Sequence, residues 1–347
     1  MFNQSLPRMG FTCKYFHPDQ SQKKKLLEEI QQPFNTRATT VAWLNRQTVE
    51  DAEQRLWDLM VHNIESYRRL IEYAGSLPEN LRMVRLGGGC LPMYTEPTWS
   101  YFWRRSDVRE YCSTEFAKVG ETARRLDVRL SMHPGQFVVL ASDNPDIVKR
   151  SIEEFEYHAD KIRWMGFGKQ FQDFKCNVHI SGRQGPDGIK KILSSLSPEA
   201  RNSITIENDE MSWGLDASLE LEKHVALVLD IHHHYIRTGE YIEPTDDRFK
   251  RVVDSWRGVR PALHYSLSRE DLLEWHSNTV RPDLNELLEQ GYKKQKLRAH
   301  SDYMWNDACN EWALSFLEHG DLMIEAKAKN LASIDLYERW QRLSIAA

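Results

Sequence analysis

The sequence lacks the features that define membrane and secreted proteins. Its 347 residues have a mean hydropathy of −0.61, and no apolar run approaches the roughly 18 residues that a membrane helix needs. The opening residues, MFNQSLPRMGFTCKYF, contain no basic segment followed by an apolar stretch and small cleavage-site residues. We therefore expect a soluble, cytoplasmic protein with no membrane partner.

Cysteine is scarce and never occurs in a CxxC pair. The cysteines are Cys13, Cys90, Cys112, Cys176 and Cys309. Five scattered thiols are typical of reduced cysteines, and they argue against a disulfide framework or a thiolate zinc site.

An excess of positive charge is also missing. The chain has 46 Lys and Arg against 51 Asp and Glu, a formal net charge of −5. This balance argues against a protein that holds nucleic acid by bulk positive potential, although local basic patches and bound metal ions are compatible with it. No low-complexity segment or solenoid repeat is present.

What the sequence does contain is a regular alternation of short β-rich runs with longer helical patterns. The predicted strands are 8–13, 83–88, 128–133, 175–180, 203–208, 225–230, 261–266 and 321–326. The predicted helices are 49–74, 107–125, 145–164, 188–196, 216–224, 246–256, 283–291 and a last one ending near 341.

Strands separated by helices imply parallel pairing with right-handed crossovers, and eight such units are typical of a closed (β/α)8 barrel. The competing fold is an open doubly wound sheet, but no GxGxxG follows the first strand. We predict a single (β/α)8 domain over residues 1–347 with loop decorations.

Histidine is the unusual count, at 13, and several histidines close predicted strands. The active site of such a barrel is built at the carboxyl ends of its strands. The polar residues at those ends are His133, His179, Glu207, Asp230 with His233, His264 and Glu325. One polar strand end is ordinary, but burying this many imidazoles and carboxylates at one rim is costly unless a cation pairs them. The pattern therefore predicts divalent metal ions, with Zn²⁺, Mn²⁺ or Fe²⁺ suited to these ligands.

Several of these segments carry a family resemblance. SMHPGQF (131–137), ITIENDE (204–210), LDIHHH (229–234), LHYS (263–266) and MIEAK (323–327) resemble the UV damage endonuclease family. That family shares its barrel and metal-site plan with endonuclease IV, and it incises double-stranded DNA on the 5′ side of UV photoproducts and some other lesions. The resemblance implies a hydrolase with one to three divalent metal ions, Mn or Zn, acting as a monomer on damaged DNA.

The resemblance also implies individual roles. It implies that Glu207 bridges two metals, with His133 on one of them. Asp230, His264 and Glu325 are implied ligands of the second metal, and His233 and His300 of a third. His179 matches a further histidine near the cluster and joins Glu207 as an implied catalytic residue. A water bound between two cations becomes hydroxide near neutral pH and attacks the phosphodiester in line.

Gln136 and Phe137 match the family pair that enters the duplex where the lesion is flipped out. An amide and an aromatic ring at a loop tip can fill that gap and stack on bases. The alternative is that Phe137 begins the apolar run FVVL and packs inside. Phe11 and Tyr15 align with lesion-pocket residues of the family. Arg104 and Arg105 lie among aromatic residues in TWSYFWRRSD, a pattern that suits contact with the DNA backbone. The same pattern equally suits the start of a helix with an aromatic face toward the core.

Two departures from the family fall in the site. Gly89 stands where the family has a metal-binding histidine, and Cys90 or His17 are the nearest candidates to compensate. Ala262 stands where the family has a lysine that can be carboxylated, so that modified group cannot form there. We expect at least one tightly bound metal and a weak or empty position beside Gly89.

Other functions suit the same ligand types. An iron-dependent oxidase or a sugar isomerase also uses histidine and carboxylate ligands on this barrel, so the metal shell alone does not exclude them. A lesion-binding relative with impaired catalysis is a third hypothesis, favoured by Gly89 and Ala262.

Overall fold

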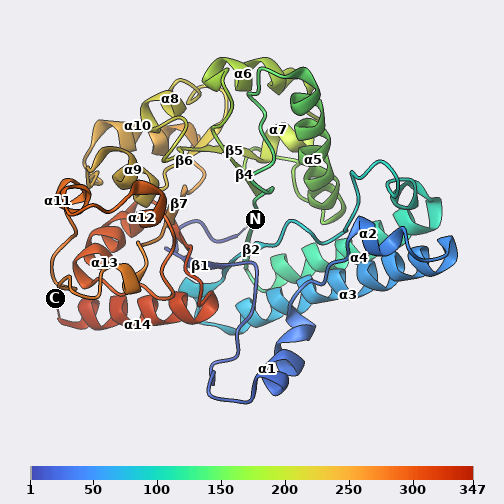
Figure 1. Ribbon diagram of the computed structural model, residues 1–347, viewed down its shortest axis with the longest axis horizontal. Coiled ribbons are helices and arrows are strands. Elements are labelled where there is room, and N and C mark those ends of the chain that lie inside the picture. The colour runs from blue at the N-terminus through green and yellow to red at the C-terminus, as the bar shows by residue number, and fades with distance from the viewer. Residues whose placement is uncertain (1, 347) are drawn as a thin grey trace.

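The structure is a computed structural model that describes residues 2–346, and its centre is one sheet of parallel strands (Figure 1). The strands are β1 (Met9–Thr12), β2 (Met83–Leu86), β3 (Arg129–Met132), β4 (Lys175–His179), β5 (Ile204–Glu207), β6 (Ala226–Val228), β7 (Ala262–Tyr265) and β8 (Asp321–Ile324). All eight lie inside the ranges predicted from the sequence, and nearly all of their residues are buried, as expected for parallel strands that are covered on both faces.

The sheet is a nearly closed barrel. Its hydrogen-bonded order is β6-β5-β4-β3-β2-β1-β8-β7, so β6 and β7 form the seam. A parallel bridge between Asp230 and His264, with the His264 amide donating to the Leu229 carbonyl at 3.0 Å, joins the seam just beyond β6. The predicted (β/α)8 fold is therefore confirmed, and the barrel closes at two of the predicted metal ligands.

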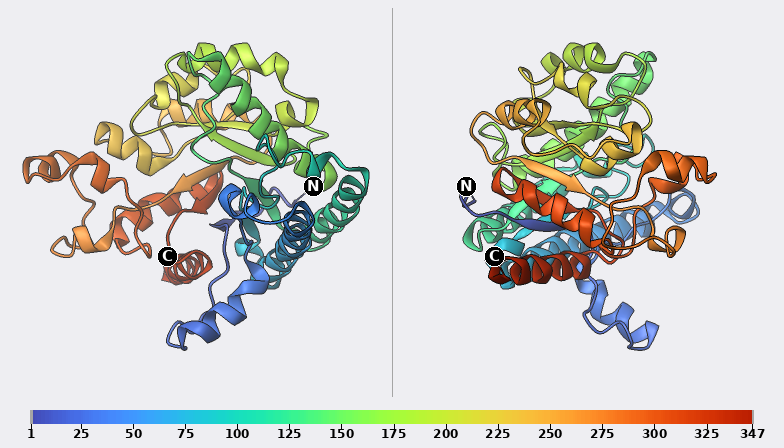
Figure 2. Two further views of the ribbon diagram at one scale, coloured as in Figure 1. Left: turned by 45° about the vertical axis from the view of Figure 1, so that its right-hand side comes forward. Right: turned by 90° about the vertical axis from the view of Figure 1, so that its left-hand side faces the viewer.

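Helices surround the barrel (Figures 1 and 2). Within residues 2–346 they are α1 (Lys24–Gln31), α2 (Val41–Leu44), α3 (Val49–Ser76), α4 (Ser106–Arg125), α5 (Pro145–Trp164), α6 (Gly185–Ile192), α7 (Pro198–Ser203), α8 (Leu215–Leu219), α9 (Ile231–Thr238), α10 (Asp247–Ser255), α11 (Leu284–Glu289), α12 (Lys294–Leu297), α13 (Asp307–Leu314) and α14 (Asn330–Ala346). In this set, none is both long enough and apolar enough to cross a lipid bilayer.

The long helices begin at the residues that their sequences indicate, and they pack their apolar faces against the core. The Thr48 side chain accepts a hydrogen bond from the Asp51 amide at 3.1 Å and caps α3. Asn144 caps α5 in the same way, with Pro145 in the first turn. The apolar residues spaced three and four apart on α3, such as Leu56, Met60 and Ile64, face the core.

The short helices differ most from the sequence predictions. The predicted helix 216–224 ends as α8 at Leu219, because turns at Leu221 and His224 lead directly into β6. The helix predicted to reach 196 ends at Ile192 and continues as a 3-10 turn. α1 was not predicted; it projects away from the barrel in every view and buries none of its residues.

Two buried histidines outside the predicted ligand set make the fold sensitive to acid. His158 on α5 and His232 on α9 are 1% and 3% exposed. Burial, with Lys161 beside His158 and His300 beside His232, holds the pKa of each imidazole well below its usual value. Both rings therefore stay neutral in the folded protein at a pH where the unfolded chain takes up protons.

We expect the free energy of unfolding to fall as the pH drops below about 6.5, the unfolded histidine pKa. Each ring contributes about 1.4 kcal/mol per pH unit, so two rings give a loss of about 3 kcal/mol at pH 5.5. Urea unfolding at pH 7.5, 6.5 and 5.5 measures this. His158→Gln removes one titrating group and should reduce the slope by its share; an unchanged slope would contradict the assignment.

Candidate metal centre

Six strand ends bring imidazoles and carboxylates to one face of the barrel, as the sequence predicted. β4 and β5 end at one of these side chains, β3 and β8 end one residue before one, His264 is the penultimate residue of β7, and Asp230 follows β6. The register explains part of the clustering, because His179 and Glu207 are direct partners on the adjacent parallel strands β4 and β5. Glu207 is fully buried at the middle of the group.

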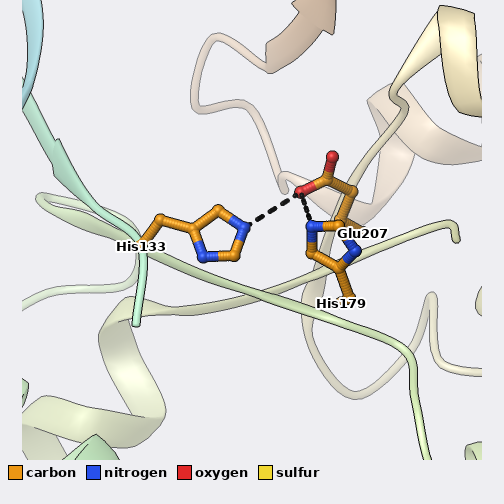
Figure 3. A group of neighbouring side chains, drawn as sticks. All are labelled: His133, His179 and Glu207. Carbon is orange, nitrogen blue, oxygen red and sulfur yellow. Dashed lines mark ion pairs between the residues drawn. The ribbon is translucent and has the colours of Figure 1, made fainter. Parts of the chain in front are cut away.

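His133, His179 and Glu207 form the first group of ligand atoms (Figure 3). The Nε2 atoms of both histidines lie 3.6 Å from the same carboxylate oxygen, Oε2 of Glu207. Behind the rings, His133 Nδ1 lies 2.6 Å from the Pro134 carbonyl and His179 Nδ1 lies 3.1 Å from an Asp209 carboxylate oxygen. Both partners are acceptors, so each Nδ1 donates to its partner, and Nε2 is the ring nitrogen that faces the centre.

Asp230, His264 and Glu325 form a second group on the other side of Glu207. His264 Nδ1 lies 3.0 Å from Oε1 of Glu207 and 3.2 Å from Oε1 of Glu325. The Asp230 side chain caps α9 by accepting from the His233 amide at 2.7 Å, and this bond positions both residues. Glu207 thus contacts imidazoles of both groups, the place expected of a bridging carboxylate.

His233 completes the cluster from the first turn of α9, a helix that the sequence did not predict. It shares one ligand group with Glu207 and Asp230, and a second with His179 and Glu210. The other two histidines of the triple point elsewhere, since His234 Nε2 contacts Glu240 at 3.0 Å and His232 is buried beside Tyr235. One histidine of LDIHHH therefore lies at the site, and the two beside it lie outside it.

Two buried cations at the site were missed by the sequence reasoning. Arg85 on β2 pairs with Glu325 through Nη1 and Oε1. Lys175, at the start of β4, is 2% exposed and its Nζ lies 2.6 Å from His264 Nε2. Both lie in short buried strands, and the sequence of such a strand does not indicate the direction in which a single charged side chain points. Together they offset part of the carboxylate charge of the site.

The electrostatics of the site reflect this crowding of charges. Burial would raise the pKa of Glu207, but His264 and His179 outweigh it and hold that pKa well below its usual value. Burial and the neighbouring Glu207 and Glu325 raise the pKa of Asp230 to about 7. Burial lowers the pKa of Lys175 to about 7. The site therefore holds ionised Glu207 together with groups that gain or lose a proton easily.

The donor set fits divalent metal ions. Each group combines imidazole nitrogens with carboxylate oxygens, and these ligand types suit Zn²⁺, Mn²⁺ and Fe²⁺. Oδ2 of Asp230 is buried and has no hydrogen-bond donor among residues 2–346, which is unfavourable for an ionised carboxylate oxygen unless a cation approaches it. A bound ion would satisfy this oxygen.

Comparison with known proteins identifies the family of this chain. A match to the family described as UV-endonuclease UvdE covers residues 16–345. The chain belongs to the UvdE family. It is 25% identical to the UV-damage endonuclease of Schizosaccharomyces pombe over 89% of this chain and 48% of that protein. It is 22% identical to the UV DNA damage endonuclease of Bacillus mycoides over 83% of both chains.

The fold is similar to a solved UvdE-type structure as well. The crystal structure of SacUVDE matches with a TM-score of 0.71 at 20% identity, covering 97% of this chain and 99% of that one. The chain spans about half the length of the S. pombe relative, and most of the length of the Bacillus protein and of SacUVDE.

The structure places the two positions, Gly89 and Ala262, at which the sequence analysis of this UvdE chain expects departures from the family. A side chain at Gly89 would meet no atom within 4 Å, so packing does not require the glycine. Cys90 does not join the ligand groups of residues 2–346, and burial raises its thiol pKa to about 12. His17 is also outside these groups; its ring contacts the Asp19 backbone. Neither candidate therefore contributes to a ligand group in this structure.

Ala262 brings no amine to the site from β7, whereas Lys175 brings one to His264 from β4. Its Nζ contacts Nε2 of His264, two residues beyond Ala262. The sequence reasoning treated the lysine as lost and gave no role to Lys175. It could not connect the two positions, since β4 and β7 are far apart in sequence and meet only across the barrel interior.

His300 lies at the edge of the site. Its Nδ1 is 3.9 Å from Oε2 of Glu325, and His300 is in none of the ligand groups found in residues 2–346. A bridge to Ser268 holds its backbone. His300 as a ligand of a third metal therefore stays a prediction.

Phe137 does not pack inside, contrary to the alternative drawn from FVVL. Its side chain is 86% exposed, and Gln136 beside it is exposed too, on the loop that follows His133. Val138 begins the buried part of the run, so the apolar pattern holds from one residue later. The two side chains are free to meet a ligand, and their role as probing residues stays a prediction.

Three of the four remaining DNA-contact candidates, Phe11, Tyr15 and Arg105, are buried or held in ion pairs. Phe11 is 1% exposed and Tyr15 is 8% exposed, and both rings pack on Tyr73. Their role in a lesion pocket stays a prediction, because in this structure both rings belong to the core. Arg104 is exposed, whereas Arg105 pairs with Glu53 and Asp107 at 2.5 and 2.7 Å.

Proposed function

We propose that the chain is a metal-dependent endonuclease that hydrolyses a phosphodiester bond of damaged double-stranded DNA. The observation that carries the proposal is the first ligand group, in which His133 and His179 direct Nε2 at one oxygen of the buried Glu207. Membership of a family whose relatives are named for UV-damage cleavage supports DNA over a sugar or an organic substrate of an oxidase.

Divalent ions in such a site would lower the pKa of bound water, supply hydroxide near neutral pH and stabilise the departing oxygen. The residues that would hold them are His133, His179, Glu207, Asp230, His264 and Glu325. Mn²⁺ and Zn²⁺ are the ions we expect. No covalent intermediate on the enzyme is needed.

The rest of the site keeps these side chains in place. Asn177 donates to Oε2 of Glu207, and Thr205 donates to the Asn177 oxygen at 2.8 Å. Asp209 accepts from His179 and is itself held by the amides of Met211 and Ser212 at 2.7 and 2.6 Å. Such outer contacts fix the orientation of the imidazoles and the carboxylate before substrate arrives.

Substrate selection is assigned to the loop after β3. Phe137 stands out from the surface three residues beyond Pro134, where it can stack on a base exposed by a lesion. The net charge of −5 predicts weak nonspecific DNA binding, so recognition would depend on the metal face, this loop and exposed basic residues such as Arg104.

A nicking assay tests the proposal. A UV-irradiated duplex and a matched unirradiated duplex are each incubated with the protein, with Mn²⁺ or with chelator. We expect incision of the irradiated strand with Mn²⁺ and none with chelator. Phe137→Ala should reduce the preference for irradiated DNA while metal content is unchanged.

The other outcomes separate the rival hypotheses. Binding of irradiated duplex without incision under any metal would indicate a lesion-binding relative with impaired catalysis. Neither binding nor incision, combined with sugar turnover or oxygen consumption, would point to one of the other barrel metalloenzymes. Incision that persists in chelator would contradict the metal dependence.

A further inference from the structure

The turn that follows β2 contains a peptide group whose carbonyl receives an unusual number of hydrogen bonds. The Gly88 carbonyl oxygen accepts from Nζ of Lys161 at 2.8 Å and from the Tyr157 hydroxyl at 3.0 Å. The Cys90 amide is a third donor to it, also at 3.0 Å. A carbonyl oxygen has two lone pairs, so three donors, one of them an ammonium, polarise this peptide group strongly.

Lys161 is a buried cation without a carboxylate partner. It lies on α5 with 0% of its surface exposed, and within residues 2–346 no carboxylate oxygen is at ion-pair distance from its Nζ. Glu154, on the same helix, accepts from the Thr95 hydroxyl at 2.7 Å instead. Burial lowers the pKa of Lys161 to about 8, so the ammonium is still charged at neutral pH. A buried charge of this kind is unfavourable until a negative charge approaches it.

The opposite end of the same peptide group, the Gly89 amide, is unused. Every peptide bond within residues 2–346 is trans, so the Gly88 carbonyl and the Gly89 N–H point in opposite directions. The carbonyl points to Lys161 in the core, and the N–H therefore points away from it. Gly89 is exposed, and its amide donates no hydrogen bond within the described chain. The donors on the carbonyl make this N–H a stronger donor than an ordinary amide.

The turn lies beside the metal centre and leaves room for a ligand. Leu86 and Met132 are register partners on β2 and β3, and a Cβ on Gly88 would lie 3.5 Å from the carbonyl oxygen of His133. A Cβ on Gly89 would meet no atom within 4 Å. A ligand oxygen can therefore approach the backbone at Gly89, next to a residue whose ring faces the centre.

We propose that the Gly89 amide, backed by Lys161, binds a phosphate of the DNA strand that neighbours the phosphate at the metal centre. This inference rests on the proposed function and adds a substrate contact that involves no metal. An outward N–H with a positive charge behind it suits an anion, and the strand that crosses the centre supplies phosphates on both sides of the cleaved bond. The bound phosphate gives Lys161 the negative charge that the protein alone does not place beside it. Lys161 acts through the Gly88 carbonyl and is a positioning residue.

The test removes one phosphate charge at a time. Duplexes with a single defined UV photoproduct carry one uncharged methylphosphonate, placed in turn at each phosphate that flanks the cleaved bond. Single-turnover incision with Mn²⁺ gives the protein concentration at half-maximal rate for each duplex. We expect one flanking position at which the uncharged group raises this concentration by about 10-fold or more, as for loss of a hydrogen bond to a charged group.

Gly89→Ala tests the same position from the side of the protein. The methyl group occupies the open space and keeps the phosphate from the amide, so the half-maximal concentration with the all-phosphate duplex should rise by about 10-fold. Thermal unfolding and metal content should not change, because the methyl group meets no protein atom and Gly89 does not have a positive φ. The methylphosphonate should then cause no further loss, since both changes remove one contact.

Lys161→Met tests the source of the polarisation. It removes the ammonium and keeps a buried side chain of similar length, so the effect of the methylphosphonate at that position should shrink while metal content is unchanged. Lys118→Met removes an exposed lysine paired with Glu115 on α4 and should behave as the unaltered protein does. Near-ultraviolet circular dichroism checks the fold of each variant.

Three results would overturn the inference. These are an unchanged half-maximal concentration with every flanking methylphosphonate, unaltered incision by Gly89→Ala, or a methylphosphonate effect that remains at full size in Gly89→Ala or Lys161→Met. If the unaltered protein incises no duplex with Mn²⁺, the proposed function fails and this inference fails with it. If the unaltered protein incises the duplex and any of the three results is found, only this inference fails.

Discussion

Replacing Glu207 by Gln should abolish incision of UV-irradiated duplex, with a loss on the order of 10³-fold, while the barrel remains folded. The residue lies in two of the ligand groups and contacts the imidazoles of His133, His179 and His264. A glutamine keeps the shape of the side chain but removes the negative charge that faces His133 and His179 on one side and His264 on the other. The loss corresponds to about 4 kcal/mol of transition-state stabilisation.

The measurement is single-turnover incision with saturating Mn²⁺, alongside metal content and thermal unfolding. Metal content should fall, because no remaining carboxylate joins the two groups. The fold should persist, since Asn177 can turn its amide and still hydrogen-bond to the new side chain. Glu243→Gln serves as the surface control. If Glu207→Gln incised DNA at the rate of the unaltered protein, Glu207 would have no role in the reaction.

Arg85→Met should destabilise the metal-free protein by roughly 3 kcal/mol and have a much smaller effect when Mn²⁺ is bound. Arg85 and Glu325 are a largely buried pair, with side chains 14% and 11% exposed. Removing the guanidinium leaves a buried carboxylate without its partner, which is the costly half of such a pair. A metal ion that binds Glu325 would replace the missing positive charge.

Urea unfolding in chelator and in saturating Mn²⁺ measures both states of Arg85→Met. The stabilisation by Mn²⁺ should be larger in the variant than in the unaltered protein, since Arg85 and the ion compete for the same carboxylate. Arg85→Lys retains a charge and should lose less stability in chelator. Equal destabilisation with and without metal would mean that Arg85 acts through packing alone.

These two predictions concern one electrostatic balance. Glu207, Asp230 and Glu325 are at most 11% exposed, and ions of this kind do not remain buried together without positive charge. In the protein alone, Arg85 is paired with Glu325, and Lys175 lies against His264. Divalent ions would then turn the acidic site into a cationic one that can accept a phosphodiester.

Local sequence determined the barrel and most of the proposed ligands. Each strand is a short apolar run between helical patterns, and strand-end residues must meet at one rim once parallel strands close into a barrel. His133, His179, Glu207, Asp230, His264 and Glu325 were identified in that way, and they lie together. The α3 and α5 boundaries followed from caps and spacing, which are also local.

Only the tertiary structure decided which residues complete the site. Arg85 and Lys175 sit inside strands, and their contacts with Glu325 and His264 join β2 to β8 and β4 to β7 across the barrel. Glu210 meets His233 because a loop after β5 and a helix after β6 turn toward each other. Such contacts depend on loop paths and on the direction of single side chains, which no local pattern encodes.

The same reason explains Phe137 and Phe11. Both residues are phenylalanines, yet the side chain of Phe137 is 86% exposed and that of Phe11 is 1% exposed. Spacing and residue type determined that this chain is a barrel with a histidine and carboxylate rim. The way distant segments pack determined which charges balance that rim, which carboxylate oxygens are left without a donor, and which ring is left in solvent.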